Sequence, residues 1–477
     1  MNFRFAPGAG PAVAASAMLA TSQPSATLAG LDILRRGGNA VDAALAAAAV
    51  LCVAEPMSTG IGGDAFALVW DGSRVHGLDA GGPAPRTAPR LPVAADGPGS
   101  PVVPGAVSGW EQLSRRFGRI GLDACLAPAI DLAERGVAAG YNCARAWRRA
   151  HRAPAQLGPA PAVGEVFRQR ELAQSLRLIA EHGADGLYRG PVARAIAAAS
   201  WLEEEDLAAY RARWVEPLST GYRGAEVVEL PAPTQGVAAL EGLALLNSLE
   251  PTLPNQVRAV GLALEDAFAT VRDGADVGAL LSPAHLAARL GQPAVLRPEL
   301  PGGTVYLCCV DDDGMAVSFI QSIFEHFGSG VVAPGTGIVL NNRAACFEIA
   351  GEVTPGRRPF HTIIPGMLLE GGRLRAPFGV MGAFIQAQAH VQLISSLLDE
   401  GLDPQAALDM PRFRIDRDAV RLEEGLWDRA SELADSGYEV ILDDDRAGFG
   451  GGQLIDLRDG RLLGGSDRRK DGFAAGF

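Results

Sequence analysis

A β-hairpin predicted over residues 304–320 constrains the fold of this chain more than any other feature. An apolar, β-branched run, 304–310, begins directly after two glycines. The acidic sequence 311–314 ends in glycine, and a second apolar run, 315–320, follows it. Two such runs around an Asp-Gly turn predict two neighbouring antiparallel strands.

Thr304, the first residue of this hairpin, has two interpretations. Threonine is common in strands and a glycine pair is common before them, so an ordinary structural role is one. The other is catalytic: if the Gly303–Thr304 bond is cut, Thr304 carries a free α-amine beside its own hydroxyl, a base–nucleophile pair. An α-amine has an ordinary pKa of about 7.7–8.0, so it can accept the hydroxyl proton at neutral pH. The hairpin alone does not decide between the two.

Several separated blocks of sequence occur in the order typical of one enzyme family. They lie at 26–30, 33–44, 55–56, 60–66, 103–110, 327–330, 340–342 and 358–362. With Thr304, these blocks resemble the γ-glutamyltransferase family of N-terminal-nucleophile hydrolases, from about Pro11 to near the C-terminus. In that family, Thr304 falls on the position of the nucleophile that the precursor exposes by cutting itself.

This resemblance implies an architecture and a processing step. The expected fold class is α/β, a four-layer αββα sandwich in which two stacked sheets are covered by helices. Cleavage between Gly303 and Thr304 would give a large segment, 1–303, and a small segment, 304–477, which together form one domain. A Gly-Gly approach suits self-cleavage, because glycine allows backbone conformations that few other residues tolerate.

Acyl transfer also needs hydrogen-bond donors for the developing oxyanion. The family uses two consecutive backbone amides after a strand, and in this chain that place is Gly382 and Ala383. If φ is positive there, an alanine adds strain. Ser322, just past the return strand, is expected either to support Thr304 or the substrate, or to be an ordinary polar residue after a strand.

The positions that hold a γ-glutamyl donor in the family differ in this chain. The carboxylate-binding arginine falls on Gly81, the ammonium-binding aspartate on Cys346, and a serine pair on His361 and Thr362. Burying charged groups without partners costs several kcal/mol. A glutamyl group is therefore expected to bind only in a rearranged way.

These replacements resemble the branch of the family that includes oxamate amidohydrolase and glutathione hydrolase-like proteins. Arg343, Asn342, His361 and Thr362 are then candidates to bind the substrate, because an arginine can pair with a small carboxylate through two hydrogen bonds. The alternative roles are an ion pair between Arg343 and a structural acid, and a satisfied core histidine at His361.

Three functional hypotheses follow from the resemblance. The first is a self-cleaving amidohydrolase, made as a zymogen, that cuts a small amide through an acyl-enzyme on Thr304. The second is a true γ-glutamyltransferase or glutathione hydrolase with a rebuilt glutamyl pocket. The third is a non-catalytic member that acts as a binding protein. Gly81 and Cys346 favour the first over the second.

Composition argues against other classes of partner. A net charge of −13 would repel nucleic-acid phosphates. The six cysteines lack C-x-x-C spacing and histidines at ligand spacing, so we expect buried thiols, no metal and no cofactor. The apolar segment 40–54 is too short to span a bilayer, and the N-terminus is not a convincing signal peptide. We therefore expect a cytoplasmic protein with no membrane role.

Hydrophobic periodicity predicts the main elements. Helices are expected at 25–36, 39–54, 108–117, 122–135, 172–182 and 386–398, and strands at 65–70, 227–230, 362–369 and 374–381. Both sheets are expected to come largely from the second half of the chain. The glycine-rich segment 60–65 loosely matches a dinucleotide-binding motif, but that motif needs a strand before it and a helix after it. Here the predicted order is reversed, so we expect a glycine-rich turn packed against other backbone.

Overall fold

Two seven-stranded sheets form the centre of this structure, a computed structural model that describes residues 10–90, 93–294, 302–350 and 352–477. The first, called here the β15 sheet, contains in spatial order β1 (Ala12–Ala14), β20 (Arg461–Ser466), β19 (Gly451–Arg458), β15 (Arg373–Met381), β14 (Gly366–Glu370), β9 (Ala225–Glu229) and β8 (Leu218–Tyr222). The second, the β10 sheet, contains β21 (Phe473–Gly476), β2 (Met18–Thr21), β10 (Gly303–Val310), β11 (Ala316–Phe324), β3 (Asp64–Trp70), β4 (Val75–Ala80) and β7 (Arg213–Val215). Neighbouring strands in both sheets are antiparallel.

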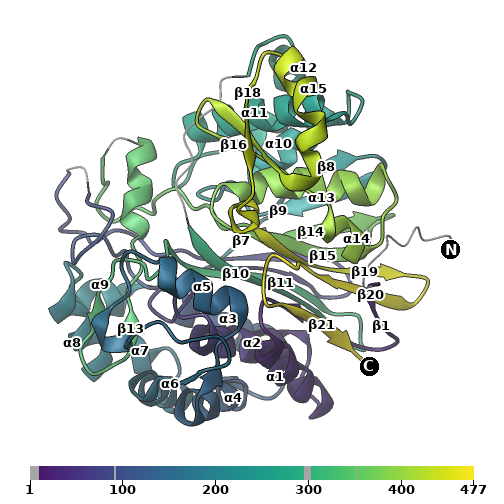
Figure 1. Ribbon diagram of the computed structural model, residues 1–477. Helices are drawn as coiled ribbons and strands as arrows, with labels where there is room; N and C mark the ends of the chain where they lie inside the picture. The colour runs from purple at the N-terminus through teal and green to yellow at the C-terminus, as the bar shows by residue number, and fades with distance from the viewer. Residues whose placement is uncertain (1–9, 91–92, 295–301, 351) are drawn as a thin grey trace.

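The two sheets pack face to face, with helices on their outer sides (Figure 1). Side chains from strands of both sheets, including Phe66, Tyr306, Met367 and Ile455, form one buried cluster between them. Over the β10 sheet lie α1 (Pro24–Arg35), α2 (Ala40–Ala54), α3 (Ala106–Phe117), α4 (Leu122–Arg135) and α6 (Arg170–His182). Over the β15 sheet lie α10 (Gly236–Leu246), α11 (Leu253–Thr270) and α13 (Ile385–Leu398). The prediction of an α/β fold is confirmed.

The predicted hairpin is confirmed as β10 and β11, which pair antiparallel at the centre of the β10 sheet. Alternation along β10 sends neighbouring side chains to opposite faces. Cys308 packs between the sheets, whereas Cys309 packs under the helices of the β10 sheet. This apolar pattern on both faces explains why β10 is buried along its whole length.

The predicted helices are all present, with ends shifted by at most two residues. The start of α2 is fixed by Asn39, whose side chain accepts hydrogen bonds from the Val41 and Asp42 amides while Asp42 accepts from the Asn39 amide. The strand at 362–369 begins later than predicted, at Gly366. The expectation that the second half supplies most strands is wrong, because half of the strands in the two sheets precede β10.

The glycine-rich turn at 60–65 lies between α2 and β3, as its sequence predicts. A Cβ atom on Gly62 would come within 2.1 Å of the Val339 carbonyl oxygen, and one on Gly63 within 2.1 Å of the Ser322 carbonyl oxygen. Only glycine permits such close backbone contact. The turn therefore packs its backbone directly against Val339 and against the C-terminal part of β11.

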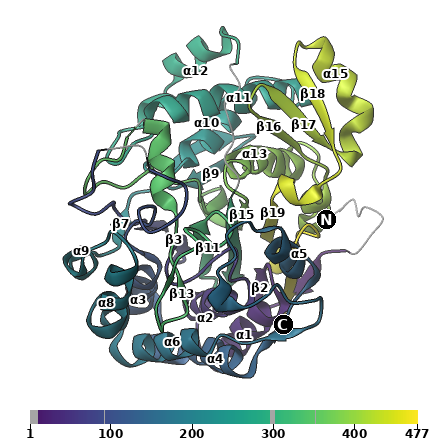
Figure 2. The same ribbon diagram turned by 60° about the vertical axis from the view of Figure 1, so that its left-hand side comes forward.

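Smaller elements complete the described chain (Figure 2). They are β5 (Val137–Ala138), α5 (Tyr141–Arg149), β6 (Val166–Phe167), α7 (Asp185–Tyr188), α8 (Gly190–Ala199), α9 (Glu204–Ala209), α12 (Pro283–Leu290), β12 (Val332–Ala333), β13 (Ile338–Val339), α14 (Pro404–Asp409), β16 (Phe413–Asp416), β17 (Ala419–Glu423), α15 (Ala430–Asp435) and β18 (Glu439–Asp443). No helix within the described ranges is long and apolar enough to cross a membrane.

Candidate active site

Thr304 lies near the start of β10, where the pairing with β11 is irregular. Gly303 faces Phe324, and the register slips before Val305 faces Gln321. Phe324 has a φ of 76°, a left-handed conformation that costs energy in a residue with a bulky side chain. The backbone around the Gly303–Thr304 bond therefore departs from regular sheet geometry on both strands.

Two hydroxyl groups converge on the carbonyl group that precedes Thr304. The Thr304 hydroxyl donates to the Gly303 carbonyl oxygen at 2.7 Å, and the Ser322 hydroxyl donates to the same oxygen at 2.7 Å. The two hydroxyl oxygens lie 3.3 Å apart, and the Phe324 amide donates to Ser322 Oγ at 2.8 Å. Ser322 thus contacts Thr304 directly and polarises the carbonyl that Thr304 would attack.

The predicted oxyanion loop, Gly382 and Ala383, follows β15 next to this bond. Gly382 has a φ of 127° and Ala383 a φ of 58°, so the alanine occupies a left-handed conformation. Neither backbone amide donates a hydrogen bond to another residue that the structure describes. A Cβ on Gly302 would come within 2.8 Å of the Ala383 Cβ, which places the loop directly beside the approach to Thr304.

A buried glutamine holds the oxyanion loop in place. The Gln235 side-chain amide donates to the Ala383 carbonyl oxygen at 3.1 Å and to the Thr362 carbonyl oxygen at 2.5 Å. Since both accepting groups are backbone carbonyls, Gln235 fixes the loop without contacting Thr304 itself. Sequence reasoning did not single out Gln235.

A cavity of about 210 Å³ opens beside Thr304 and Gly382. Its wall comes from separated parts of the chain: Gln23, Glu55, Met57, Ser58, Asn142, Cys143, Arg145, Ala146, Arg149, Gly302, His326, Asp445, Ala447, Arg469, Lys470 and Asp471. A second hollow, of about 330 Å³, shares Arg149, Gly302, His326, Gly382 and Ala447 with it. The nucleophile candidate and the oxyanion loop therefore face a space that a small molecule can enter.

His326 lies at the junction of the two hollows. A Cβ on Gly303 would come within 2.6 Å of the His326 ring, so the imidazole stands against the Gly303–Thr304 bond. Burial, and to a lesser degree the positive charge of Lys470, lowers the pKa of His326 to about 4. The ring is neutral at physiological pH and can exchange a proton only as a weak base.

The residues predicted to bind substrate lie in a buried polar cluster that does not line either hollow. Arg343 is fully buried, and its Nε lies 3.1 Å from the Asp64 carboxylate. It also donates to the Thr362 hydroxyl at 3.2 Å and stacks over the Phe324 ring at 4.7 Å. Burial favours the neutral acid at Asp64, but the hydrogen bond and charge of His361 and the charge of Arg343 hold its pKa below the usual range.

His361 packs into the same cluster. Its Nδ1 contacts the Pro359 carbonyl oxygen at 2.8 Å, and its Nε2 lies 3.4 Å from Asp64. A Cβ on Gly81 would meet the His361 ring at 2.9 Å and the Phe66 ring at 2.9 Å. The space beside Gly81, where the resemblance leads us to expect the family's arginine side chain, is therefore already filled by these two rings.

Asn342 is also held by the protein. Its side-chain amide donates to the Ala95 carbonyl oxygen at 2.7 Å and to the Glu325 carboxylate at 2.9 Å, and its oxygen accepts from the Glu325 amide. Of the predicted residues, the structure thus brings Thr304, Ser322, Gly382 and Ala383 together. Arg343, Asn342, His361 and Thr362 lie behind them.

One further polar cluster and the cysteines are less suited to catalysis. Glu241, Asp266 and His285 could in principle hold a metal, but His285 Nε2 contacts both carboxylates and Arg289 pairs with Asp266. Burial and the neighbouring Asp266 raise the pKa of Glu241 to about 10, so this acid keeps its proton. The six cysteines are free and buried, as predicted.

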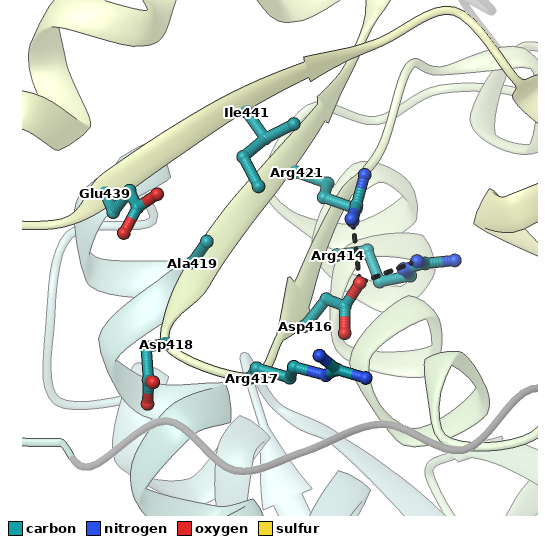
Figure 3. A pocket seen from close by; sticks show the side chains of 8 residues that line it. All are labelled: Arg414, Asp416, Arg417, Asp418, Ala419, Arg421, Glu439 and Ile441. Atoms are coloured by element: carbon teal, nitrogen blue, oxygen red, sulfur yellow. Dashed lines mark hydrogen bonds and ion pairs between the residues drawn. The ribbon is translucent and has the colours of Figure 1, made fainter.

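A hollow of about 550 Å³ lies on the small sheet formed by β16, β17 and β18 (Figure 3). Three of its charged side chains pair with one another: Asp416 accepts from Arg414 at 3.1 Å and from Arg421 at 2.7 Å. The residues around it include no hydroxyl or thiol nucleophile. The cavity at Thr304 is therefore the candidate active site.

Comparison with known proteins identifies the family of this chain. The family described as gamma-glutamyltranspeptidase matches residues 26–477, which is nearly the whole chain. The chain belongs to the gamma-glutamyltranspeptidase family. Family membership identifies it as an enzyme of the hydrolase or acyltransferase type.

Individual members of the gamma-glutamyltranspeptidase family match over almost their full length. The glutathione hydrolase-like YwrD proenzyme of Bacillus subtilis is 33% identical over 95% of this chain and 97% of its own. The oxamate amidohydrolase proenzyme of Klebsiella pneumoniae is 33% identical over 94% of this chain and 96% of its own. The crystal structure of cephalosporin acylase from Bacillus halodurans superposes with a TM-score of 0.94, at 39% identity, over 100% of this chain and 98% of that one.

Proposed function

We propose that this chain is a self-cleaving amidohydrolase that cuts small amides through an acyl-enzyme on Thr304. The observation that carries the proposal is the Thr304 hydroxyl, 2.7 Å from the Gly303 carbonyl oxygen and beside a cavity lined by Gly382, whose amide donates to no described residue. The proenzyme names of the related proteins support processing. In this proposal, segments 1–303 and 304–477 are the two subunits of one αββα sandwich.

Self-cleavage would begin with attack of Thr304 Oγ on the Gly303 carbonyl carbon. The Ser322 hydroxyl donates to the oxygen that becomes negative, which stabilises the tetrahedral intermediate. The carbon–nitrogen bond then breaks, the Thr304 nitrogen takes the proton, and an ester replaces the amide. Water hydrolyses this ester, leaving a carboxylate on Gly303 and a free amine and hydroxyl on Thr304.

Turnover would repeat this chemistry on a substrate. The α-amine of Thr304 accepts the hydroxyl proton while Oγ attacks the substrate carbonyl, and the amides of Gly382 and Ala383 stabilise the oxyanion. The proton moves to the leaving amine as the carbon–nitrogen bond breaks. Water then attacks the acyl ester and regenerates Thr304; an acceptor amine would give transfer instead.

Arg343, Asn342, His361 and Thr362 remain candidate recognition residues in this proposal. Arg343 Nη2 is buried and has no hydrogen-bond partner among the residues described, whereas His361 Nε2 faces the Asp64 carboxylate at 3.4 Å. Arg343 therefore keeps one polar atom for a ligand, while the rest of the cluster is committed to the protein. Their contribution would be secondary to that of the cavity wall.

The alternative of a true γ-glutamyltransferase has less support from the geometry. The His361 ring occupies the space beside Gly81, and Arg343 lies 3.9 Å from the Cys346 sulfur, where the family has its aspartate. A non-catalytic binding protein is disfavoured by the position of the Thr304 hydroxyl against the Gly303 carbonyl group and by the Gly382 and Ala383 amides, which donate to no residue that the structure describes.

Substrate turnover by Thr304 variants tests the proposed function. The wild-type chain, Thr304→Ser and Thr304→Ala would be assayed against γ-glutamyl- and simple acyl-p-nitroanilides. We expect p-nitroaniline release by wild type, slower release by Thr304→Ser and none by Thr304→Ala. Mass spectrometry of quenched reactions should find the acyl group on the Thr304 peptide. Equal rates for wild type and Thr304→Ala would overturn the proposal.

A further inference from the structure

Lys470 stands out because it is the only lysine among 477 residues. It lies just before β21, is half-buried and lines the 210 Å³ cavity together with Thr304 and Gly382. The mechanism proposed above does not use it. A cationic side chain in the cavity wall that the mechanism leaves unused raises the question of what it binds.

The backbone on the N-terminal side of Lys470 is held rigidly. The Lys470 amide donates to the Asp467 carbonyl oxygen at 3.0 Å. The Asp467 carboxylate accepts from Arg412 at 2.7 Å and from Arg469 at 3.1 Å, and both arginines are buried. The turn that carries Lys470 is therefore fixed by a buried ion-pair network, and the Asp467 carboxylate is occupied.

The C-terminal side is fixed as well. The Asp471 carboxylate accepts from the backbone amides of Asn142 at 2.9 Å and Cys143 at 3.0 Å, at the start of α5. These bonds occupy the nearest acid in the sequence. Lys470 therefore sits between two carboxylates that are both committed to other groups.

The stem of Lys470 runs toward the oxyanion loop. A Cβ on Gly451 would come within 2.5 Å of the Lys470 Cγ, so the stem packs across a residue that has no side chain. Gly451 pairs with Met381, the residue directly before Gly382. This places the aliphatic part of Lys470 one strand away from the amides that would hold the oxyanion.

The arginines of the cavity wall have ion-pair partners, whereas Lys470 has none among the residues that the structure describes. Arg145 and Arg149 each lie 2.5 Å from Asp445. In the described part of the chain, no carboxylate lies within 4.0 Å of the Lys470 ammonium. Glu55 also lines the cavity; burial raises the pKa of Glu55, and the charge of Lys470 offsets this only in part.

We propose that Lys470 binds a carboxylate of the substrate and makes the enzyme selective for small anionic amides, such as half-amides of dicarboxylic acids. This inference rests on the proposed function. The Lys470 ammonium lines the cavity without an ion-pair partner among the described residues, and a substrate carboxylate would supply a charge-assisted hydrogen bond there. The small cavity brings that carboxylate within reach of Lys470 while the amide carbonyl meets Thr304.

Two substrates of equal shape test the selectivity. N-Succinyl-p-nitroanilide carries a carboxylate, and its succinamide counterpart carries a neutral primary amide in the same place. Lys470→Met should raise KM for the anionic substrate by about tenfold to a hundredfold, since a charge-assisted hydrogen bond is lost. The kcat should change little, and the neutral substrate should change by less than about threefold. Lys470→Arg should retain most of the selectivity.

Equal losses for the two substrates with Lys470→Met would overturn the proposal and indicate a structural role toward Glu55. Unchanged kinetics with both substrates would overturn it too. Circular dichroism and the urea midpoint of each variant would confirm that the fold is intact. Selectivity for the neutral substrate in wild type would contradict it most directly.

A binding experiment separates this inference from the proposed function, because it needs no turnover. Reductive ¹³C-methylation keeps the charge of an amine, and it gives one side-chain signal in this protein, from Lys470, besides those of α-amines. The signal is assigned by its loss in Lys470→Arg. We expect succinate to shift it and succinamide to leave it in place, in wild type and in Thr304→Ala. No shift with succinate, or an equal shift with chloride, would refute carboxylate binding even if the enzyme is active.

Discussion

Two polar regions lie close to the same strands and differ in how their charges are satisfied. The cavity at Thr304 is lined by Gly382, whose amide donates to no residue that the structure describes, and by Lys470, which has no ion-pair partner among those residues. The cluster around Arg343 and Asp64 is buried and largely bonded within itself. Judged by residue type alone, the charged cluster would be the ligand site. The hydrogen bonds and ion pairs favour the cavity instead, because the cluster is already bonded within the protein. A charged side chain signals a binding site only when the protein leaves it without a partner.

Breaking the buried cluster should give the largest effect, and it should be on stability. Asp64→Asn leaves the Arg343 guanidinium without a counter-charge, which should lower the free energy of unfolding by about 3–5 kcal/mol. Asp445→Asn, at a partly exposed pair on the cavity wall, should lower it by less than about 1 kcal/mol. Urea unfolding at neutral pH measures both, and equal losses would remove the distinction between the regions.

Gln235 bridges the two regions, so its loss should affect activity more than binding. Gln235→Ala releases the Ala383 and Thr362 carbonyl groups and should lower kcat by about tenfold to a hundredfold with little change in KM, because the oxyanion amides lose their alignment. Gln405→Ala, which removes a buried glutamine bonded to the Ser466 backbone, is the matched control. It should lower stability and leave kcat within about threefold. A similar kcat for both variants would argue against a positioning role.

Restoring the family's arginine should fail in this chain. Gly81→Arg forces atoms into the His361 and Phe66 rings and should cost about 1–3 kcal/mol of stability without creating γ-glutamyl hydrolysis. His361→Ser in the same chain should recover part of that stability. Hydrolysis of γ-glutamyl-p-nitroanilide and thermal melting follow the two effects. A gain of γ-glutamyl activity in the single variant would show that the glutamyl pocket is still open.

The stability of the fold should depend on pH through His326, which lines the cavity. The pKa of His326 is lowered to about 4, mainly by burial, so the folded protein binds its proton less readily than the unfolded chain. As pH falls from about 6.5 toward 4, the unfolded state gains that proton and stability is lost. His326→Asn should flatten the curve of melting temperature against pH in this range. His182→Asn, at an exposed surface site, should leave the curve unchanged.

The smallest effect is expected at the oxyanion loop itself. Ala383→Gly removes a left-handed alanine, but glycine gains freedom in the unfolded chain, so the free energy of unfolding should change by less than about 1 kcal/mol. The absent methyl group should raise kcat/KM more for bulky acyl groups than for small ones. A uniform change across acyl sizes would show that the methyl group does not face the acyl pocket.

The sequence predicted the parts of the fold that depend on interactions between residues close together along the chain, such as turns and helix caps. The hairpin follows from two apolar runs and a turn, and the start of α2 follows from Asn39 and Asp42. The share of strands from each half was wrong, because short edge strands such as β7 and β8 have weak periodicity. Whether such a segment forms a strand depends on its pairing with the rest of the sheet.

The site was predictable only for residues that lie on or next to a predicted strand. Thr304 and Ser322 lie on the two strands of the predicted hairpin, and Gly382 directly follows a third predicted strand, β15. Lys470, by contrast, reaches the cavity from the far end of the chain, and its one available signal was its being the only lysine. Arg343 was predicted to bind substrate because the sequence does not reveal its ion-pair partner. That partner, Asp64, lies 279 residues away along the chain.

Intact-mass spectrometry of the freshly purified chain, with N-terminal sequencing of every fragment, tests the central claim most directly. The account predicts two associated pieces, the smaller one beginning at Thr304, and a single uncut chain of 49.6 kDa for Thr304→Ala. A correctly folded wild-type chain that stays whole on long incubation would contradict it, because Thr304 would then have no free amine to act as base.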